Sequence, residues 1–510
     1  MSSRYAPPAP QLVQARTAAG ISAAIAFVVY LRTMLPGVSV QDWAEMQYIP
    51  AQLGIPHPTG FPLYVLAGKV FSLLPVGSYA FRAGLLSVAV AAAVVGVAAL
   101  IAGRLGVRPL VAAAAALALA FSGTLWLEAT FPEMNGLHVL LVGLVVHRAL
   151  VWRAERRDRD LLLGALLSGL AFSNHLLAAT TVPIVVVFIL WDARQRLRER
   201  PALLLQAALL FVVGLTPYLF IPLRALAGPP EVYGHLTTLD GLVTLITGSE
   251  YHGTMNFLSA DSLAAAGQAI PTIVPHLVGR SSPLFIVAAV VGLGLLARRD
   301  RWLAAILLLL AASGIYFLAN YVTDFYHYLL VAWLVLAIGF AVAGEWLVGR
   351  LEGRFGPGGA AAQVLLLLLP LSIVLQQWPV NDQSRNEVGE RLSEKVFSLL
   401  PQDAVLVTYW DLLTTMSYKH CMEGVRPDVT LLAHDPPSRV TCDRATEPLE
   451  DQVRRGQQVY VLFARWDHYE PFRRSFDLVP GPTLDLPYGQ RYLDHQGTLD
   501  RLELIERAEG

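Results

Sequence analysis

Two acidic residues and a histidine lie close together in the segment VQDWAEMQYIPAQLGIPHP, which follows the first apolar stretch of the chain. Asp42 and Glu45 are three residues apart, so both carboxylates would lie on one face of a helix. His57 follows in a proline-rich loop. A carboxylate held there, beside the membrane surface, could act as a general base toward a lipid-borne substrate. The alternative is that Asp42 only caps a short interfacial helix and that Glu45 is solvated.

The same three side chains offer ligands for a divalent metal ion, because carboxylate oxygens are the ligands that hard cations prefer. They are too few for a closed metal site, so we expect neither a metal nor a cofactor and keep a divalent ion as the alternative. The sequence has no Walker-type phosphate loop, no Gly-x-Gly-x-x-Gly turn and no His-Glu-x-x-His pair. The missing nucleotide-binding module argues against an ATP-driven pump.

Polar side chains recur in the other segments that we predict on the same side of the membrane. Ionisable residues near a membrane core are energetically costly, so they are functional candidates by default. Taken singly, each could be an interfacial anchor or a helix cap; together they predict an outward-facing polar cavity. These residues are Glu128, Glu133, Asn135, His138, Asn174, His175, Arg224, Glu231, His235, Glu250, Tyr251, His252, Asp324 and His327.

The composition separates the chain into two parts. Of its 510 residues, 55% are hydrophobic and 15% are charged, against about 25% charged in ordinary soluble chains. Residues 1–378 carry 23 Lys/Arg and 17 Asp/Glu, whereas residues 379–510 carry 15 and 22. The first part is therefore typical of a membrane protein and the second of a soluble domain. A disordered chain, a cytosolic enzyme and a nucleic-acid binder are disfavoured.

Apolar segments of membrane-crossing length predict the architecture of residues 1–378. About 17–25 apolar residues span a hydrocarbon core, and the sequence offers eleven candidates, of which the fifth and sixth are short. We therefore predict an α-helical polytopic membrane protein of about 11 spans with a small C-terminal extracytoplasmic α/β domain. The candidate spans are about 16–35, 79–103, 109–127, 134–152, 161–174, 176–191, 202–222, 283–297, 302–320, 326–346 and 361–378.

Basic residues set the predicted orientation. With the N-terminus inside, 18 of the 23 Lys/Arg residues of the first part fall in cytoplasmic segments, as the positive-inside rule requires. The protein is then a multi-pass protein of the inner (cytoplasmic) membrane with residues 379–510 outside. We expect no cleavable signal peptide and interpret the first apolar stretch as a retained span. Cys421 and Cys442 would face an oxidising compartment, where a disulfide and a free pair are both open.

Two large outer loops are predicted, at about 36–79 and 224–282. In the first, residues 63–75 have apolar side chains at helical spacing and predict a helix in the interface plane; the second predicts short amphipathic helices interrupted by Pro and Gly. In the tail, DAVLVTY, DVTLLAH and QVYVLFAR predict strands, and LLTTMSYKHCMEG predicts a crossover helix between the first two. Alternating strands and helices favour an α/β domain.

The run QDWAEMQ, followed by LGIPHPTGFPLYVLAGKVFSLLPVGSYAFRAGLLS, resembles the start of the transmembrane protein O-mannosyltransferase family. Further blocks match in order, among them SGTLWLEATFPEMNGLHVLL, LSGLAFSNHLLAATTVP, TPYLFIPLRALAGPP and TGSEYHG. The resemblance covers roughly residues 16–430. It implies a multi-span glycosyltransferase of the GT-C superfamily, whose donors are polyprenyl-phosphate sugars. In the family's HPPG-like turn, Thr59 replaces the second Pro.

The resemblance also implies roles for individual residues. The family's first-loop acidic pair falls on Asp42 and Glu45, where GT-C enzymes place the acidic residue that deprotonates the acceptor. The motif departs from the family's WDSGE-like form, because Trp43 follows the Asp and Ala44 replaces Gly, so which carboxylate acts stays open. The implied substrate-binding residues are His57, Glu133, Asn174, His175, Arg224, Tyr251 and His252.

The chemistry of a polyprenyl-phosphate sugar indicates what else such a site needs. Its phosphate lies at the membrane surface and requires cationic or hydrogen-bonding groups, for which Arg224 and His57 are the outer-side candidates. Inverting transfer requires a carboxylate that takes the proton of the acceptor hydroxyl. Asp42 is our first choice for this base and Glu45 the second. Because the leaving group is already a phosphate, one essential carboxylate suffices.

Two other classes of function remain as alternatives. A secondary transporter or lipid flippase also has polar residues in its spans, but the sequence shows no two related halves. A non-catalytic membrane scaffold could use the tail to bind a partner. Within the leading hypothesis the acceptor is a protein or a glycan, and mannose is suggested by the family resemblance alone, because kinship does not fix a substrate.

Overall fold

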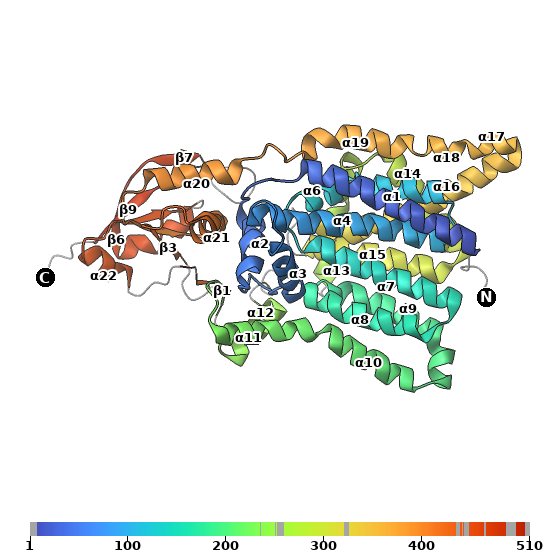
Figure 1. Ribbon diagram of the computed structural model, residues 1–510, viewed down its shortest axis with the longest axis horizontal. Helices are drawn as coiled ribbons and strands as arrows, with labels where there is room; N and C mark the ends of the chain where they lie inside the picture. The colour runs from blue at the N-terminus through green and yellow to red at the C-terminus, as the bar shows by residue number, and fades with distance from the viewer. Residues whose placement is uncertain are drawn as a thin grey trace.

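The computed structural model describes residues 8–234, 236–249, 251, 260–320, 326–434, 439–440, 442, 448–463, 466–485 and 496–504. A bundle of long helices carries a smaller, sheet-containing domain at one end (Figure 1). The bundle helices are α1 (Ala9–Thr33), α4 (Tyr79–Arg104), α5 (Pro109–Ala120), α6 (Gly123–Thr130), α7 (Asn135–Glu155), α8 (Asp158–Asn174), α9 (Ala178–Glu199), α10 (Ala202–Gly214), α13 (Ala260–Gly279), α14 (Pro283–Arg299), α15 (Arg301–Asn320), α16 (Leu330–Phe355) and α19 (Leu368–Asn381), with short η4 (Tyr326–Leu329), α17 (Pro357–Ala360) and α18 (Ala362–Leu365).

Shorter elements lie at the domain-facing end of the bundle. Most come from the two segments predicted as large loops, whereas η2 and the start of α11 fall at the end of the predicted span 202–222. The helix predicted over 63–75 corresponds to α3, which ends at Ser72. These elements are α2 (Gln41–Gln52), α3 (Pro62–Ser72), η2 (Thr216–Leu219), α11 (Phe220–Ala227), β1 (Val232–Tyr233) and α12 (Leu239–Thr247).

The helix lengths confirm the predicted polytopic fold class. Among the described residues, eight helices are long and apolar enough to cross a membrane, or ten if each of two bent helix pairs is one span. The remaining predicted segment is α8, which has 17 residues. The bends are at α5–α6, 64°, and at α13–α14, 114°.

The bend at α5–α6 interrupts the span predicted at about 109–127, whereas the bend at α13–α14 joins a helix of the second predicted loop to the span predicted at about 283–297. After α5, the Gly123 amide donates to the carbonyl of Arg280 at 2.7 Å instead of continuing the helix ladder. Pro283 begins α14, and a proline suits the first position of a new helix because it has no amide hydrogen to leave unpaired. α13 is also longer than the predicted short helices, with two prolines inside its 20 residues.

Helices of the bundle pack closely where glycine removes the side chain. A Cβ atom on Gly292 of α14 would lie 1.7 Å from the carbonyl oxygen of Gly339 on α16. A Cβ on Gly169 of α8 would lie 2.8 Å from the Cα of Gly214 on α10. Small residues let backbones approach in this way, which is how helices associate without a hydrophobic driving force in lipid.

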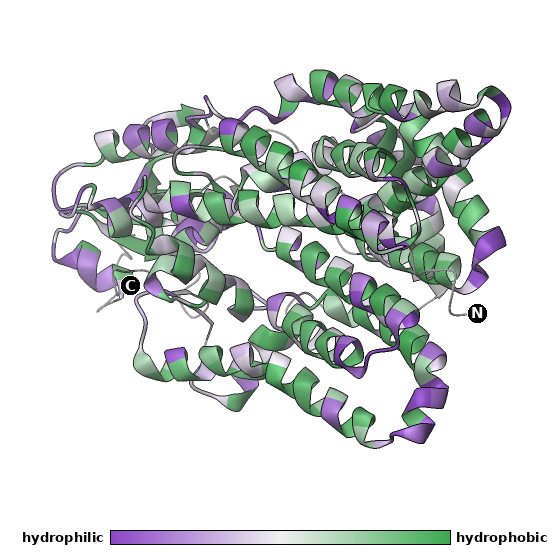
Figure 2. Ribbon diagram, turned by 45° about the vertical axis from the view of Figure 1, so that its right-hand side comes forward, coloured by the Kyte–Doolittle hydropathy of each residue, from purple (hydrophilic) through white to green (hydrophobic). Residues whose placement is uncertain are grey.

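Arginines gather at the end of the bundle away from the sheet domain. Figure 2 shows hydrophobic residues along the long helices and hydrophilic residues at these helix ends. The arginines pair with acidic residues across helices: Arg104 with Glu155 at 2.7 Å, and Arg153 with Asp300 and Arg196 with Asp158, both at 2.8 Å. The segments predicted as cytoplasmic therefore share one end, and the sheet domain lies at the other. The orientation in a membrane stays a prediction.

The C-terminal domain is built on a five-stranded sheet in the order β3-β2-β5-β9-β6. β2 is central to its parallel part, since it pairs parallel with both β3 and β5, whereas β9 pairs antiparallel with β5 and β6. The strands are β2 (Val405–Thr408), β3 (Thr430–Ala433), β4 (Arg439–Val440), β5 (Val459–Leu462), β6 (Phe476–Val479), β7 (Thr483–Asp485), β8 (Gln496–Thr498) and β9 (Asp500–Leu504). The helices are α20 (Val388–Leu399), α21 (Trp410–Ser417), η5 (Tyr418–Met422), α22 (Leu449–Arg454), η6 (Trp466–Tyr469) and η7 (Phe472–Arg474).

The three parallel strands and α21 are those that the sequence predicted, and the antiparallel strands were not. Cys421 and Cys442, whose pairing the sequence left open, form a disulfide with Cα atoms 6.0 Å apart. The adjacent β4 pairs antiparallel with β1 from the second large loop of the bundle. The disulfide therefore fixes the strand pair through which that loop contacts the domain.

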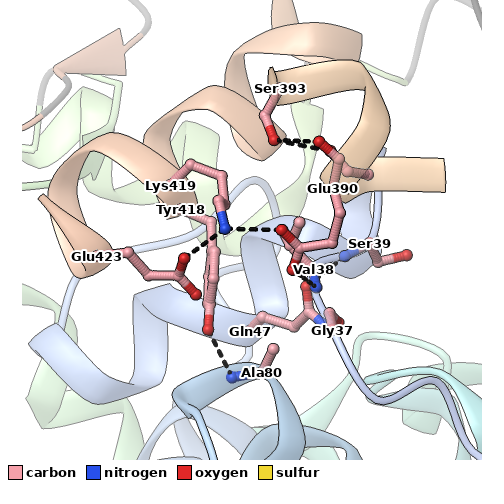
Figure 3. Close-up of polar contacts among 11 residues, drawn as sticks. Gly37, Val38, Ser39, Gln47, Ala80, Glu390, Ser393, Tyr418, Lys419 and Glu423 are labelled. Carbon is pink, nitrogen blue, oxygen red and sulfur yellow. Dashed lines mark hydrogen bonds and ion pairs between the residues drawn. The ribbon is translucent and has the colours of Figure 1, made fainter. Parts of the chain in front are cut away.

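Polar contacts join the domain to the segment before α2 (Figure 3). The Val38 amide donates to Oε1 of Glu390 at 3.2 Å, and Lys419 Nζ donates to its Oε2 at 2.6 Å. The Ala80 amide donates to the hydroxyl of Tyr418 at 3.0 Å, and the Thr415 hydroxyl donates to the carbonyl of Ser39 at 3.0 Å. Residues 382–387 form the covalent connection. The domain is thus docked onto the first large loop.

We predict that Tyr418→Phe weakens this junction. Tyr418 is fully buried, and without its hydroxyl the buried Ala80 amide loses its acceptor. Leaving such a donor unpaired costs about 1–3 kcal/mol. The thermal unfolding midpoint of the purified protein should fall, whereas Tyr460→Phe, which removes a surface hydroxyl, should leave it unchanged. Equal midpoints for the two variants would contradict the assignment.

Candidate active site

A cavity of about 650 Å³ lies beside α2, at the end of the bundle that carries the C-terminal domain. Residues from both large loops and from several bundle helices form its wall. The polar and charged lining residues are Gln41, Asp42, His57, Thr59, Thr124, Glu128, Glu133, Asn135, His175, Thr180, Thr247, Tyr251, His276, Arg280, Tyr326, His327 and Tyr328.

The short helix α2 places Asp42 and Glu45 as their spacing predicted, but gives them different surroundings. Asp42 lies in the first turn and lines the cavity. Glu45 is fully buried and pairs with the His57 ring through Nδ1. It also accepts from the His57 backbone amide at 3.2 Å. Glu45 therefore holds the proline-rich loop against α2, and Asp42 is the carboxylate that faces the cavity.

The acidic neighbours change the charge of His57. Burial lowers the pKa of the His57 ring, but the carboxylates of Glu45 and Asp42 outweigh this effect and raise the pKa to about 9. At neutral pH the ring is therefore a cation on the cavity wall. An imidazolium there can bind an anion such as a phosphate.

Asp42 also contacts the C-terminal domain. The indole Nε1 of Trp410 donates to its Oδ1 at 2.6 Å. The ring of Trp410 lies edge-on to that of His57, with centroids 5.3 Å apart. A residue 368 positions away in the sequence thus completes the surroundings of the carboxylate.

One ligand atom from each of Asp42, Glu45 and His57 lies within 4.8 Å of the others, so the three could surround a cation. In this arrangement, however, Glu45 is paired with His57 and Asp42 accepts from Trp410. Glu45 and His57 are therefore engaged with each other, and a metal ion at this position would require the His57 ring to turn away from Glu45.

Glu133 forms a second acidic part of the wall. Its Oε2 accepts from the Met134 amide and from Asn135 Nδ2, both at 3.1 Å. Burial, together with the nearby carboxylates of Glu128 and Asp42, raises the pKa of Glu133 well above its ordinary value. A raised pKa favours the protonated form, which repels an anion less than a carboxylate does.

Asn174 and His175 differ in position as Glu45 and Asp42 do: the first residue of each pair is buried behind the cavity wall, and the second lines the cavity. Asn174 is fully buried and donates to the carbonyl of Met134 at 3.0 Å, so it fixes the wall from behind. His175 lines the cavity, and its Nδ1 accepts from the Leu177 amide at 3.0 Å. Burial and the neighbouring histidines lower the pKa of His175 well below its ordinary value, so the ring is neutral and carries its proton on Nε2.

Arg224 is not among the residues that line the cavity, whereas another arginine, Arg280, is. Arg224 donates to the carbonyls of Leu53 at 2.9 Å and Gln52 at 3.4 Å, which closes the end of α2. Arg280, which follows α13, lines the cavity instead. Among the described residues, no carboxylate pairs with its guanidinium group. Arg280 carried one sequence signal, since it is among the five basic residues outside the predicted cytoplasmic segments.

Other polar residues, some of which the sequence had singled out, complete the cavity wall. Thr59 Oγ1 and Asn135 Oδ1 are buried polar atoms on the wall without a hydrogen-bond partner among the described residues. His276 stacks on Tyr326 with centroids 3.6 Å apart. Tyr251 lines the cavity as predicted, and His252 lies outside the described residues. The open polar atoms suit a ligand rich in hydroxyl groups.

The chain is similar to a known protein family, to curated proteins and to solved structures. Residues 42–198 match the family described as the protein O-mannosyl-transferase TMEM260 N-terminal domain. The chain is 27% identical over 436 residues to protein O-mannosyl-transferase TMEM260 of Mus musculus, covering 81% of this chain and 61% of that protein. The corresponding protein of Dictyostelium discoideum is 24% identical, over 85% and 59%. The chain therefore spans about 60% of the length of these relatives.

The fold is that of a solved bacterial membrane protein. ArnT from Cupriavidus metallidurans bound to undecaprenyl phosphate superposes with a TM-score of 0.60 at 13% identity, covering 94% of this chain and 97% of that one. Its apo structure gives 0.59 at 12% identity with the same coverage. The family model and the relatives confirm the resemblance to O-mannosyltransferases that the sequence motifs indicated, and the superposition shows that the chain shares the ArnT fold.

We predict that the Glu45–His57 pair makes stability depend on pH. Because the pKa of His57 is raised in the folded state, its contribution is complete below about pH 6.5 and is lost as pH rises through about 9. The unfolding midpoint of the wild type should fall across that interval more steeply than that of His57→Gln. Parallel pH curves for the two proteins would contradict the pairing.

Proposed function

We propose that the protein is an integral-membrane glycosyltransferase that moves a sugar from a polyprenyl-phosphate donor to an acceptor hydroxyl. The observation that carries this proposal is the cavity wall itself, where the Asp42 carboxylate shares one chamber with the cations His57 and Arg280. The relatives named O-mannosyl-transferases and the ArnT fold support the same reaction class.

Asp42 acts as the general base in this proposal. Its carboxylate faces the cavity, whereas that of Glu45 is buried and engaged with His57. Asp42 accepts the proton of the acceptor hydroxyl as the acceptor oxygen attacks the anomeric carbon of the sugar. The bond from that carbon to the phosphate oxygen breaks, and the phosphate leaves with the electron pair. Attack opposite the leaving group inverts the anomeric configuration.

Arg280 and His57 bind the donor phosphate. Both line the cavity, and a charged donor forms a stronger hydrogen bond to a phosphate than a neutral one does. The ArnT structure bound to undecaprenyl phosphate supports a lipid-linked donor for this fold. Arg224, which the sequence suggested for this role, instead stabilises the end of α2 through two backbone carbonyls.

Neutral polar groups complete the sugar site. His175 offers a proton on Nε2, and Thr59 and Asn135 have open oxygen atoms on the wall. Hydroxyl groups of a sugar both donate and accept, so such a mixture can bind them without excess charge. The relatives' names support mannose as the transferred sugar and a protein as the acceptor.

The reaction takes place at the outer face of the cytoplasmic membrane. This placement follows from the positive-inside rule, because the arginine-rich ends of the bundle lie opposite the C-terminal domain. No nucleotide pool exists on that side, which favours a lipid-linked donor. We further propose that transfer needs no resident metal ion, since the phosphate cations are supplied by side chains.

The test is transfer of radiolabelled sugar from a panel of polyprenyl-phosphate sugars to native membranes by purified protein. We expect wild-type transfer and a loss of at least about 100-fold in Asp42→Asn, because the base is removed. Asp477→Asn, an exposed carboxylate in β6, should retain full activity. Addition of EDTA should leave the wild-type rate unchanged.

Each failure would identify a different error in the proposal. Full activity of a folded Asp42→Asn protein would exclude the assigned base. Loss of activity in EDTA, restored by a divalent cation, would exclude metal-independent transfer. A folded wild type that transfers no sugar from any donor would exclude the function itself.

We predict that the two arginines differ in their effect on donor binding. Arg280→Gln should raise the KM for the lipid donor roughly 10- to 100-fold, as expected for a lost charged hydrogen bond. Arg224→Gln should lower thermal stability and leave that KM near the wild-type value. If the KM rose in Arg224→Gln and not in Arg280→Gln, Arg224 rather than Arg280 would bind the phosphate.

A further inference from the structure

We propose that Trp410 of the C-terminal domain is a positioning residue for Asp42. The inference rests on the function proposed above and adds the outer domain to its machinery. The indole Nε1 of Trp410 donates to Oδ1 of Asp42 at 2.6 Å; Trp410 begins α21, and Asp42 lies in the first turn of α2. The domain thereby supplies a hydrogen bond to the carboxylate that takes the proton.

The position of Trp410 is fixed by the sheet. It begins α21 two residues after β2, the strand that is hydrogen-bonded on both sides by β3 and β5. Since β2 is parallel to both neighbours, the carboxyl edge of the parallel strands is the edge from which Trp410 emerges. Ligand sites of α/β folds commonly lie at this edge, and here it faces the cavity wall.

Ring contacts limit the rotamers of the indole. Trp410 lies edge-on to His57, with centroids 5.3 Å apart and an interplanar angle of 87°. Its ring also lies edge-on to Tyr233 of β1, at 5.9 Å and 82°. An aromatic ring held by two edge contacts keeps its N–H direction, so the hydrogen bond to Asp42 is preorganised.

The same helix also contacts the chain just before the candidate base. Thr415, on the next turn of α21, donates to the carbonyl of Ser39 at 3.0 Å, three residues before Asp42. Two contacts from α21 therefore reach the first loop, one to its backbone and one to the carboxylate. Removing the indole donor should disturb the carboxylate while the backbone anchor stays.

The hydrogen bond from Trp410 also gives the two carboxylate oxygens of Asp42 different roles. Oδ1 is occupied by the indole, which leaves Oδ2 to accept the acceptor proton. The described charged or titratable groups around the carboxylate are Glu45 on the same helix, His57, Glu133 and His327. Trp410 differs from them in being a donor that does not titrate.

The test compares Trp410→Phe with the matched control Trp346→Phe, whose indole is exposed on α16. Trp410→Phe keeps an aromatic ring, although a smaller one, and loses the N–H donor, so kcat for sugar transfer should fall roughly 10- to 100-fold. The KM for the lipid donor and the unfolding midpoint should stay near the wild-type values, and the control should match the wild type in all three.

A second measurement detects the hydrogen bond without relying on transfer. In protein labelled with ¹⁵N-tryptophan, one of the ten indole N–H signals should be missing in Trp410→Phe, and the same signal should shift in Asp42→Ala. Trp410→Tyr provides the assignment if the phenylalanine variant does not fold.

The outcomes separate this inference from the function on which it rests. An unchanged kcat in folded Trp410→Phe, beside an active wild type, overturns the positioning role and leaves the glycosyltransferase intact. An indole signal that does not respond to Asp42→Ala also overturns it. A wild type without transfer from any donor overturns the proposed function, and the positioning role with it.

Discussion

The buried pairing of Glu45 with His57 is the interaction on which the site depends. A carboxylate without solvent must be paired, because removing its partner from a buried ion pair costs about 3–5 kcal/mol. Glu45 meets this requirement through the ring and the backbone amide of His57. The pairing joins α2 to the loop that follows it, and it places a cation beside the cavity. The orientation of Asp42 is a consequence, since it lies one helical turn earlier on the same face.

Electrostatics divides the bundle along its length. At one end, arginines are neutralised by acidic partners from neighbouring helices, as Arg104 is by Glu155. At the other end, His57 and Arg280 lie on the wall of a cavity among neutral and acidic groups. The first arrangement stabilises the fold and matches the charge rule for membrane insertion. The second leaves positive charge accessible to a ligand, which is the property that a phosphate site requires.

The sequence pattern predicted those features that depend only on residues close together in the chain. The three-residue spacing of Asp42 and Glu45 was enough to place them on one helix, and alternation in the tail was enough to predict the parallel strands. The sequence could not distinguish Arg224 from Arg280, because their side-chain directions depend on tertiary contacts that no local pattern encodes. The contact between Trp410 and Asp42 could not be predicted for the same reason, because no periodicity links two residues that are 368 positions apart in the sequence.

The connection between bundle and domain limits how the site can be entered. Residues 382–387 reach at most about 20 Å when fully extended, and Gln383 is itself hydrogen-bonded to the carbonyl of Thr33 at 2.8 Å. The strand pair β1–β4 and the neighbouring disulfide hold the opposite side of the domain. A domain fastened at two places cannot swing aside to admit a bulky folded substrate. Under the proposed function, an acceptor would therefore enter as an extended, exposed segment, which selects for hydroxyl groups in flexible regions regardless of the surrounding fold.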